Sequence, residues 1–231
     1  VIQKAGFESI GEAGTYEIME TPPDTLIERI KDLKVNGYNG FNVTIPLKVP
    51  ISLFLDEFDE TANIAGCANT VKIMPDKSFK GYNTDIYGFW AALPKNADLN
   101  GKKAGILGTG GASRAATVGL IQAGIKEINY FSRNIINSAE MINSMRQAFP
   151  EIKFNNYQIQ MLRDLPELAI LVNCTPIGIR GNSMDQMPIS ILDLEKLDKS
   201  TIVYDVIYNP TKTLLLRSEE RRVGKECRSR W

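Results

Sequence analysis

Three short polar motifs in the first half of the chain carry side chains suited to proton chemistry. They are Asn-Val-Thr-Ile-Pro-Leu-Lys at 42–48, Ala-Asn-Thr at 68–70 and Asn-Thr-Asp at 83–85, each at or beside the end of an expected strand. A lysine beside an aspartate in a partly desolvated site can exchange a proton with a substrate hydroxyl while the carboxylate holds that hydroxyl. Lys48 and Asp85 are candidates for such a pair, whereas composition alone favours an ordinary surface lysine at position 48.

The absence of histidine narrows the chemistry. With no histidine in 231 residues, the chain has no imidazole base, no serine–histidine or cysteine–histidine nucleophile pair and no histidine-ligated zinc. Proton transfer must therefore use Lys, Asp, Glu, Tyr or Cys.

A glycine-rich loop lies in the second half. The run Gly-Thr-Gly-Gly-Ala-Ser-Arg at 108–114 follows an apolar segment at 103–107 and opens a helical pattern. Such glycines permit a tight turn and a close backbone approach to a pyrophosphate, which the free N–H groups at the helix start, expected at 112–114, would bind. A plain turn between a strand and a helix is the alternative. The residues predicted to bind the pyrophosphate are Gly108, Gly110, Gly111, Ala112, Ser113 and Arg114.

The residue type at the end of the next expected strand, at 127–131, indicates which cofactor the site selects. A site that selects NAD places Asp or Glu there to bind the ribose 2′-hydroxyl, roughly 20 residues after the loop. This chain has Arg133 instead, within Tyr-Phe-Ser-Arg-Asn at 130–134. A planar guanidinium suits a 2′-phosphate, so the sequence predicts NADP, the alternative being a solvated arginine at the strand end.

The elements that must position these motifs form an alternating α/β pattern. The first half is expected to form strands at 15–19, 40–45, 69–74 and 79–82, and helices from Pro22-Pro23 to Gly37, at 47–58 and at 85–93. The helix before Gly37 should carry an apolar stripe of Leu26, Ile27, Ile30 and Leu33.

The second half predicts a doubly wound parallel sheet of Rossmann type. Strands are expected at 103–107, 127–131, 153–157, 169–174 and 202–206, with helices at 112–123 and 138–148. The predicted fold is a two-domain α/β protein. Its parts are an incomplete substrate domain at 1–87, a nucleotide-binding domain at 88–216 and a tail at 217–231.

Composition and charge exclude several classes of protein. The 27 Lys and Arg balance 27 Asp and Glu, so the chain lacks the positive excess that nucleic acids and acidic membranes require. No apolar run approaches the roughly 20 residues that cross a bilayer, and no signal-peptide pattern is visible. Cys67 and Cys174 are expected to be buried thiols; with Cys227 they are too few for a disulfide framework or a metal cage. We expect a cytoplasmic protein with a small-molecule partner.

Six motifs follow one another along the chain. Besides the three polar motifs and the glycine-rich loop, they include Asn-Cys-Thr-Pro-Ile-Gly at 173–178 and Tyr-Asp-Val-Ile-Tyr-Asn-Pro at 204–210. Together they resemble the shikimate dehydrogenase family, NADP enzymes of the chorismate pathway, over nearly all of residues 5–216. A single motif is only moderately specific, whereas six in this order are strongly specific.

The resemblance implies a role for each motif. Lys48 would be the acid–base lysine and Asp85 its partner, both bound to hydroxyls of the substrate. A hydride would move between the nicotinamide and a ring carbon of the substrate, while Lys48 supplies or removes the proton on the oxygen. The other substrate residues would be Thr44, Asn69 and Tyr208. The cofactor would contact Gly108–Arg114 at its pyrophosphate, Arg133 and Asn134 at its 2′-phosphate, and Thr175, Val206 and Ile207 along its flank.

The chain departs from the family pattern at both ends. The family's first strand and Ser-x-Ser loop, which holds the substrate carboxylate, are missing, as are the closing helices with a Gly near the nicotinamide and a Gln at the substrate. Asn137 stands where a second basic residue often follows the Arg133 position. Residues 217–231 resemble a translated sequencing adapter, a native basic arm being the alternative. We therefore expect an internal fragment that exposes apolar surface, is poorly stable and is inactive by itself.

Two other functions stay open. A related quinate/shikimate dehydrogenase would use NAD or NADP. A non-catalytic metabolite sensor would keep the fold, although it would be expected to lose the lysine or the aspartate, and both Lys48 and Asp85 are present. The sequence is compatible with a monomer or a homodimer.

Overall fold

The computed structural model describes residues 2–164, 167–181 and 183–223. The chain divides into two compact units, residues 1–38 and 39–231. The predicted division between residues 87 and 88 falls within helix α4 (Asp85–Ala92) of the second unit, which holds both sheets. Every predicted site residue lies in this second unit.

The first unit is helical. It contains α1 (Ile2–Ser9), a single 3-10 turn η1 (Pro23–Thr25) and α2 (Leu26–Val35). The strand predicted at 15–19 is wrong, because alternation alone supplies no neighbouring strand for the backbone hydrogen bonds, and Ile18 is 95% exposed. The stripe of α2 is narrower than predicted: Leu26, Ile30 and Leu33 are buried, whereas Ile27 is exposed.

A small four-stranded sheet opens the second unit. Its strands lie in the order β1 (Gly40–Asn42), β3 (Thr70–Ile73), β4 (Phe79–Tyr82) and β2 (Glu57–Phe58). The hairpin predicted between β3 and β4 is confirmed, with Met74 N–H donating to the Ser78 carbonyl at 2.9 Å. The strand predicted at 40–45 ends early, because the chain turns at Thr44, whose carbonyl accepts from Leu47 N–H at 2.8 Å.

The helix predicted at 47–58 is wrong. The structure has a 3-10 helix η2 (Pro50–Phe54) followed by β2, and then α3 (Glu60–Ala65). Pro50 has no N–H to donate within a continuous helix. Asp56 also anchors the chain beside β4, since its N–H donates to the Phe79 carbonyl and its carboxylate accepts from Phe79 N–H.

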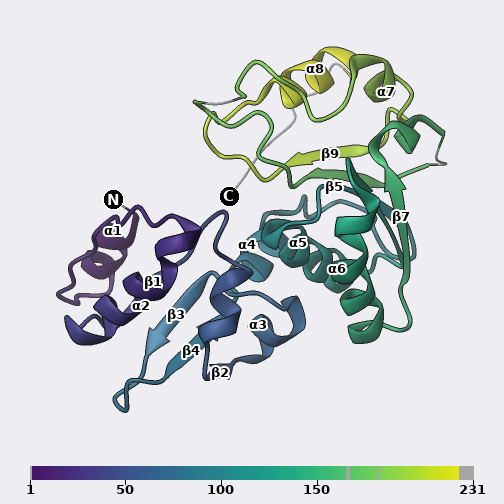
Figure 1. The fold of residues 1–231 in the computed structure, drawn as a ribbon. Coiled ribbons are helices and arrows are strands. Elements are labelled where there is room, and N and C mark those ends of the chain that lie inside the picture. Colours follow the sequence, from purple (N-terminus) through teal and green to yellow (C-terminus); the bar gives the residue numbers. More distant parts are fainter. Residues whose placement is uncertain (1, 165–166, 182, 224–231) are drawn as a thin grey trace. The chain divides into compact units, whose positions relative to one another are not determined.

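The larger sheet is parallel throughout, as predicted. Its order is β7 (Lys153–Gln158), β6 (Glu127–Ser132), β5 (Lys103–Leu107), β8 (Ile170–Asn173) and β9 (Ile202–Asp205). Helices α5 (Gly111–Gln122) and α6 (Ile135–Ala148) cover one face, and α7 (Ile191–Glu195) and α8 (Leu214–Val223) the other, as Figure 1 shows. The 3-10 helix η3 (Ile159–Asp164) follows β7. The doubly wound α/β class is therefore confirmed.

Alternating residues of these strands fill two cores. Ile106, Tyr130 and Tyr204 belong to the core under α5 and α6. Their neighbours Leu107, Phe131 and Val203 belong to the core under α7 and α8, which also contains Leu215 and Leu216. Because successive strand residues point to opposite faces, both faces of the sheet are apolar.

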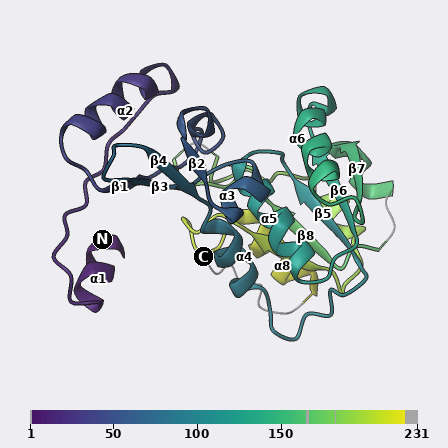
Figure 2. The same cartoon turned by 90° about the horizontal axis from the view of Figure 1, so that it is seen from below.

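Helix α4 connects the small sheet to the large one and packs beside α5 (Figure 2). Gly119 of α5 allows this approach, because a Cβ there would lie 2.7 Å from the Phe89 ring of α4. The residues that follow Asp85 are therefore anchored in the core of the larger sheet.

Helix α8 runs through residues 217–223 of the predicted tail. Residues 224–231, including Cys227, lie outside the described part of the chain. The non-native origin of the tail stays a prediction.

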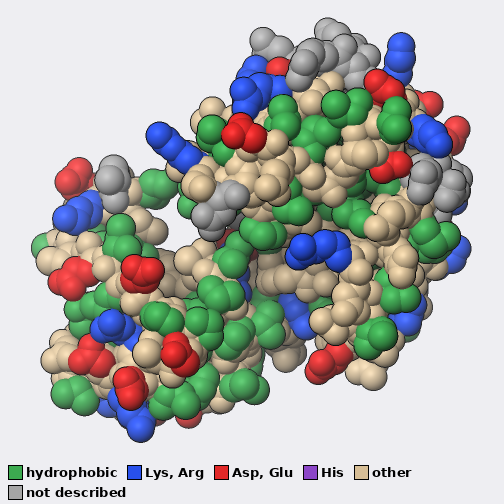
Figure 3. Space-filling model, turned by 45° about the horizontal axis from the view of Figure 1, so that its top comes forward, with side chains coloured by type: hydrophobic (Ala, Val, Ile, Leu, Met, Phe, Trp, Pro, Cys, Tyr) green, Lys and Arg blue, Asp and Glu red, His purple; other side chains and the backbone are tan. Residues whose placement is uncertain are grey.

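The surface carries charges of both signs. On the face drawn in Figure 3, acidic and basic side chains are interspersed with apolar and polar ones, and neither sign covers a continuous field among the described residues. Within the same residues, no helix has both the length and the apolar character needed to span a bilayer.

Candidate active site

Lys48 and Asp85 face each other in the structure. Lys48 Nζ lies 2.5 Å from Asp85 Oδ2, and the two side chains are 15% and 12% exposed. Asp85 is the first residue of α4, where the partial positive charge of the helix N-terminus favours a carboxylate. The pair is therefore mostly withdrawn from water but still partly exposed.

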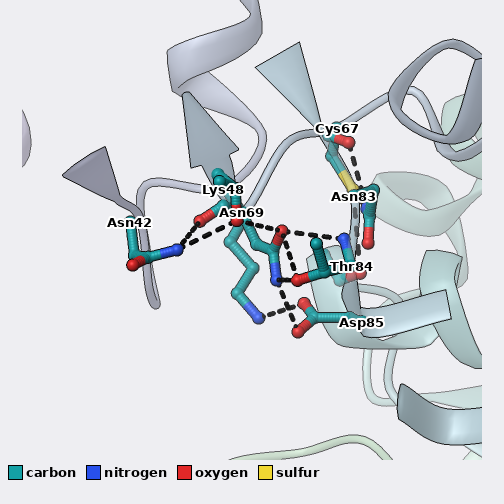
Figure 4. A network of polar contacts seen from close by, with 9 residues as sticks. Asn42, Lys48, Cys67, Asn69, Asn83, Thr84 and Asp85 are labelled. Carbon is teal, nitrogen blue, oxygen red and sulfur yellow. Dashed lines mark hydrogen bonds and ion pairs between the residues drawn. The ribbon is translucent and has the colours of Figure 1, made fainter. Parts of the chain in front are cut away.

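Asn69 is the centre of the surrounding network (Figure 4). Its amide Nδ2 donates to Asp85 Oδ1 at 2.8 Å and to Thr84 Oγ1 at 2.9 Å. Its Oδ1 accepts from the Thr84 N–H and the Thr70 hydroxyl, each at 3.0 Å. Because Asn69 binds one carboxylate oxygen and Lys48 the other, the orientation of Asp85 is fixed.

Backbone hydrogen bonds join the three polar motifs. Ala68 N–H donates to the Lys48 carbonyl at 3.1 Å, Val43 N–H to the Asn69 carbonyl at 2.8 Å, and Asn69 N–H to the Tyr82 carbonyl at 3.1 Å. The motifs are thus adjacent because of the pairing of β3 with β1 and β4.

This arrangement can perform acid–base chemistry on a hydroxyl or carbonyl oxygen. The Lys48 ammonium can donate a proton, its neutral amine can accept one, and the Asp85 carboxylate can accept a hydrogen bond from the same ligand. The amide of Asn69 supplies a neutral donor beside them. No nucleophile is required for this chemistry.

Two predicted substrate residues lie outside the network. Thr44 is exposed on the turn before Lys48, and Tyr208, beyond β9, is 70% exposed. Within the described residues, no hydrogen bond joins either side chain to Lys48 or Asp85. Thr84, which sequence analysis did not select, does belong to the network.

The glycine-rich loop connects β5 to α5. Gly108 has φ +91°, a conformation that favours glycine, and a Cβ there would lie 3.1 Å from Thr175 Cγ2. The Gly108 N–H donates to the Phe131 carbonyl of β6 at 2.9 Å. The structure thus brings together two of the predicted cofactor residues, Gly108 and Thr175.

Helix α5 begins one residue earlier than expected. Gly110 is its N-cap, and the N–H groups of Ser113 and Arg114 both donate to the Gly110 carbonyl. The expectation that the N–H groups of Ser113 and Arg114 are free is therefore wrong. The third N–H group of that expectation, at Ala112, also lies in the first turn of α5. The Arg114 guanidinium points away from the loop and donates to the Ala65 carbonyl of α3 at 3.2 Å.

Arg133 and Asn134 follow β6. Arg133 is exposed, and Asn134 caps α6, its Oδ1 accepting from the N–H groups of Ile136 and Asn137. The helix therefore starts at Ile135, three residues before its expected start. The cap uses the Asn134 amide oxygen and does not involve its amide nitrogen.

The loop fits a dinucleotide. A Cβ on Gly110 would meet nothing within 4 Å, so a phosphate can approach the backbone there. The loop and Arg133 follow the adjacent parallel strands β5 and β6, whose carboxyl ends lie at the same sheet edge. Val206 and the buried Ile207 follow β9, at the same edge.

A second polar network, which sequence analysis did not identify, lies at the ends of β8 and β9. Asp205 is fully buried and accepts from Asn173 Nδ2 at 3.1 Å, Ile207 N–H at 3.0 Å and Thr213 Oγ1 at 2.8 Å. Asn173 Oδ1 in turn accepts from the Thr175 hydroxyl and N–H. Burial raises the pKa of Asp205 above its ordinary value, with the three donors opposing that shift.

The expectation of buried thiols at Cys67 and Cys174 is confirmed. Burial raises the pKa of Cys67 to about 11, and the nearby Arg114 and Lys48 lower it less. Burial likewise raises the pKa of Cys174. Both are thiols rather than thiolates near neutral pH.

Comparisons with known proteins agree with this geometry. The profile of the family described as "Shikimate dehydrogenase substrate binding domain" matches residues 1–71. A shikimate dehydrogenase (NADP(+)) of Caldanaerobacter subterraneus subsp. tengcongensis is 35% identical over 94% of this chain and 76% of its own length.

Solved structures show the same fold. Shikimate 5-dehydrogenase of Thermus thermophilus, in complex with NADP(H) and shikimate, has a TM-score of 0.78 at 28% identity, covering 99% of this chain and 80% of that one. The Listeria monocytogenes enzyme, in complex with shikimate and NAD, has a TM-score of 0.79 at 28% identity, covering 99% and 79%. The motifs, the fold and these likenesses together place the chain in the shikimate dehydrogenase family.

Proposed function

We propose that this protein is a shikimate dehydrogenase, which interconverts 3-dehydroshikimate and shikimate with NADPH and NADP⁺ in aromatic biosynthesis. The observation that carries the proposal is the 2.5 Å contact between Lys48 Nζ and Asp85 Oδ2, within a network of hydrogen-bonding groups suited to a polyhydroxylated ring. Curated relatives that match most of the chain have the corresponding activity in their names.

Each polar side chain has a definite task in this reaction. The nicotinamide supplies a hydride to the carbonyl carbon of 3-dehydroshikimate when bound. The Lys48 ammonium donates the proton that converts the carbonyl oxygen to a hydroxyl, and the neutral amine takes that proton back in the reverse direction. Asp85 and Asn69 hold a hydroxyl of the ring, and Thr44 and Tyr208 are further substrate contacts.

The cofactor is assigned to the loop after β5 and the end of β6. Gly108 and Gly110 of the loop, with Gly111, Ala112 and Ser113 of the first turn of α5, receive the pyrophosphate; Arg114 belongs to the same helical turn, and its side chain is directed at α3. Arg133 and Asn134 bind the 2′-phosphate, and Thr175, Val206 and Ile207 flank the cofactor. The open space beside Gly110 and the exposed guanidinium of Arg133 support this assignment.

The proposal assigns substrate binding and cofactor binding to two different domains of the chain. Residues 1–87 form the substrate domain and residues 88–216 the NADP domain, which the substrate-domain match over residues 1–71 supports. The partner is the small-molecule substrate, and the place of action is the cytoplasm, where NADPH-dependent biosynthesis occurs.

The test is reduction of NADP⁺ by shikimate, followed by absorbance of the product NADPH, with the full-length product of the gene. We expect turnover with shikimate and NADP⁺ and much weaker turnover with quinate or with NAD⁺. Preference for quinate or for NAD⁺ would favour the quinate/shikimate enzyme, a possibility kept open by the complex of the Listeria enzyme with NAD. Binding of shikimate without turnover would favour the metabolite sensor.

Arg133→Ala tests the choice of cofactor. Removing the guanidinium takes away a charge-assisted contact worth about 1.5–3 kcal/mol, so affinity for NADPH should fall roughly 10- to 150-fold. Affinity for NADH, which has no 2′-phosphate, should barely change. Equal affinities of the wild type and the variant for NADPH would remove Arg133 from the proposed site.

A further inference from the structure

The first turn of α5 makes three contacts with the small-sheet region, one with Lys48 and two with the segment just before the motif at 68–70. Gly111 lies against the Lys48 stem, and the Gly111 carbonyl accepts a weak hydrogen bond from Cys67 Sγ at 3.8 Å. Arg114 Nη1 donates to the Ala65 carbonyl at 3.2 Å. The turn assigned to the cofactor therefore also supports the acid–base side chains.

Gly110 and Gly111 differ sharply in what surrounds them. A Cβ on Gly110 would meet nothing within 4 Å, whereas a Cβ on Gly111 would lie 2.9 Å from Lys48 Cβ and 3.3 Å from Lys48 Cδ. The space beside Gly110 is free for a ligand, and the space beside Gly111 is filled by the lysine. Sequence analysis gave the two glycines the same role.

The lysine cannot easily move away from an added methyl group. The closest atom is Cβ, the root of the side chain, so a change of rotamer near the amine does not relieve the contact. The backbone of Lys48 is held by the hydrogen bond from Ala68 N–H, and its amine by Asp85. A side chain at position 111 must therefore shift the lysine or the turn.

Arg114, from the same turn of α5, contacts the end of α3, which leads into the segment that carries Asn69. Gly66 ends α3 with φ +61°, and a Cβ there would lie 2.8 Å from Arg114 Nη1. The guanidinium thus closes the end of α3, directly before the segment from Cys67 to Asn69. One turn of α5 consequently supports both Lys48 and the segment before β3 that carries Asn69.

We infer that Gly111 is a positioning residue for Lys48: its missing side chain sets how closely the lysine stem approaches α5, and so where the amine meets Asp85 and the substrate. The inference rests on the proposed function of Lys48. It separates two adjacent residues by the space beside each: the space beside Gly110 is left to the cofactor, and the space beside Gly111 sets the place of the proton donor.

The experiment compares Gly111→Ala with the matched control Gly110→Ala in the full-length product of the gene. A displacement of a catalytic group by about 1 Å costs on the order of 100-fold in rate, so we expect about this fall in kcat for Gly111→Ala. Its dissociation constant for NADPH, measured by fluorescence titration, should stay within about threefold of the wild type, because alanine keeps the backbone N–H of residue 111 and its added Cβ faces Lys48. Gly110→Ala should instead weaken NADPH binding by more than its kcat falls.

A double variant separates positioning from general damage. In a Lys48→Ala background, Gly111→Ala should cause little further loss of kcat, because residues that act through one another are not additive. Circular dichroism and thermal denaturation show whether each variant is folded. If Gly111→Ala weakens NADPH binding as much as Gly110→Ala and leaves kcat intact, or if its loss of kcat is undiminished without Lys48, the inference is overturned.

A crystal structure of Gly111→Ala keeps this result separate from the proposed function. We expect the distance between Lys48 Nζ and Asp85 to exceed the hydrogen-bond limit in the variant. An unmoved lysine contradicts the inference even if the enzyme is a shikimate dehydrogenase. A moved lysine in a protein that does not turn over shikimate supports the inference about geometry and rejects the proposed function.

Discussion

Two aspartates in the same compact unit, each beside an asparagine, have opposite surroundings. Asp85 receives Asn69 on one oxygen and the Lys48 ammonium on the other, and its side chain is 12% exposed. Asp205 receives Asn173, a backbone N–H and a hydroxyl, is fully buried, and has no cationic partner within the described part of the chain. The residue types are similar, but the charges and the access to solvent differ.

The difference shows how one side chain serves chemistry in one place and structure in another. A carboxylate with a cation and an opening to solvent can exchange protons and bind a ligand. A carboxylate enclosed by neutral donors has no route for a ligand, and its three hydrogen bonds instead hold the loops after β8 and β9 in place. Asp205 therefore shapes the neighbourhood of Thr175 and Ile207 without taking part in the reaction.

The largest effect is expected from Lys48→Ala. Removing the proton donor should lower kcat by about 10²- to 10⁴-fold, the range of general acid–base catalysis, with a smaller change in the KM for shikimate. Steady-state kinetics of the full-length protein measure both constants. A fall in kcat of less than about tenfold, equal to 1.4 kcal/mol in the barrier, would remove Lys48 from the acid–base role.

A matched pair of substitutions tests the comparison directly. Asp85→Asn should lower kcat by at least about 10²-fold, because it removes the charge that orients the Lys48 ammonium and the bound hydroxyl. Asp205→Asn makes the same chemical change but should lower kcat by less than about tenfold. An asparagine at 205 can still accept from Ile207 N–H and donate to Thr213. Similar losses of kcat in the two variants would contradict the assignment of Asp205 to structure.

The pH dependence of stability gives a third test. Because burial raises the pKa of Asp205 above its ordinary value of 3.8, the folded protein keeps a proton that the unfolded chain has already lost. The free energy of unfolding contributed by Asp205 is therefore highest below that value and falls as the pH rises through the raised pKa, by up to about 1.4 kcal/mol per pH unit.

Asp205→Asn isolates this contribution. Other titrating groups affect both proteins equally, so the stability of the wild type relative to the variant should decline with rising pH across this range. Urea unfolding at a series of pH values measures the difference. A difference that is constant with pH would show that the pKa of Asp205 is ordinary in the folded protein, and a difference that rises would show that this pKa is lowered; either result contradicts the prediction.

Much of the larger sheet could be predicted from the sequence, and the physical reason is local. Most of its strands, though not β7, are short runs rich in apolar residues, so the sequence predicts β5 at 103–107, as found, and β6 at 127–131, against Glu127–Ser132 in the structure. The strand expected at 15–19 is wrong because its alternating pattern contains no partner strand, and the helix expected at 47–58 is wrong because Pro50 has no N–H to donate and the chain after it pairs beside β4. Asp56 enters the edge of the small sheet through Phe79, which lies more than twenty residues away.

The site residues likewise divide into those that local motifs reveal and those that only tertiary contacts reveal. Lys48, Asn69 and Asp85 could be selected from motifs, and the structure brings their side chains together. The roles given to Thr44, Tyr208, Arg133 and the glycine-rich loop stay predictions. Asp205 and the contact of Gly111 with Lys48 could not be found from spacing, because burial and the meeting of α5 with the small sheet decide them.

The smallest difference between the two regions is expected in the reactivity of their thiols. Cys67 and Cys174 should react alike, although the aspartates near them differ in charge partners and exposure. Cys67 lies beside the Lys48 network and Cys174 beside Asp205, and burial raises both pKa values, that of Cys67 to about 11. At pH 8 each is a protonated, enclosed thiol, so iodoacetamide should leave both unlabelled in the folded protein and label both in urea. Peptide mapping by mass spectrometry identifies each cysteine. Rapid labelling of Cys67 alone would mean that the Lys48 side of the molecule opens to solvent more readily than the Asp205 side, and that access distinguishes the two regions more than charge does.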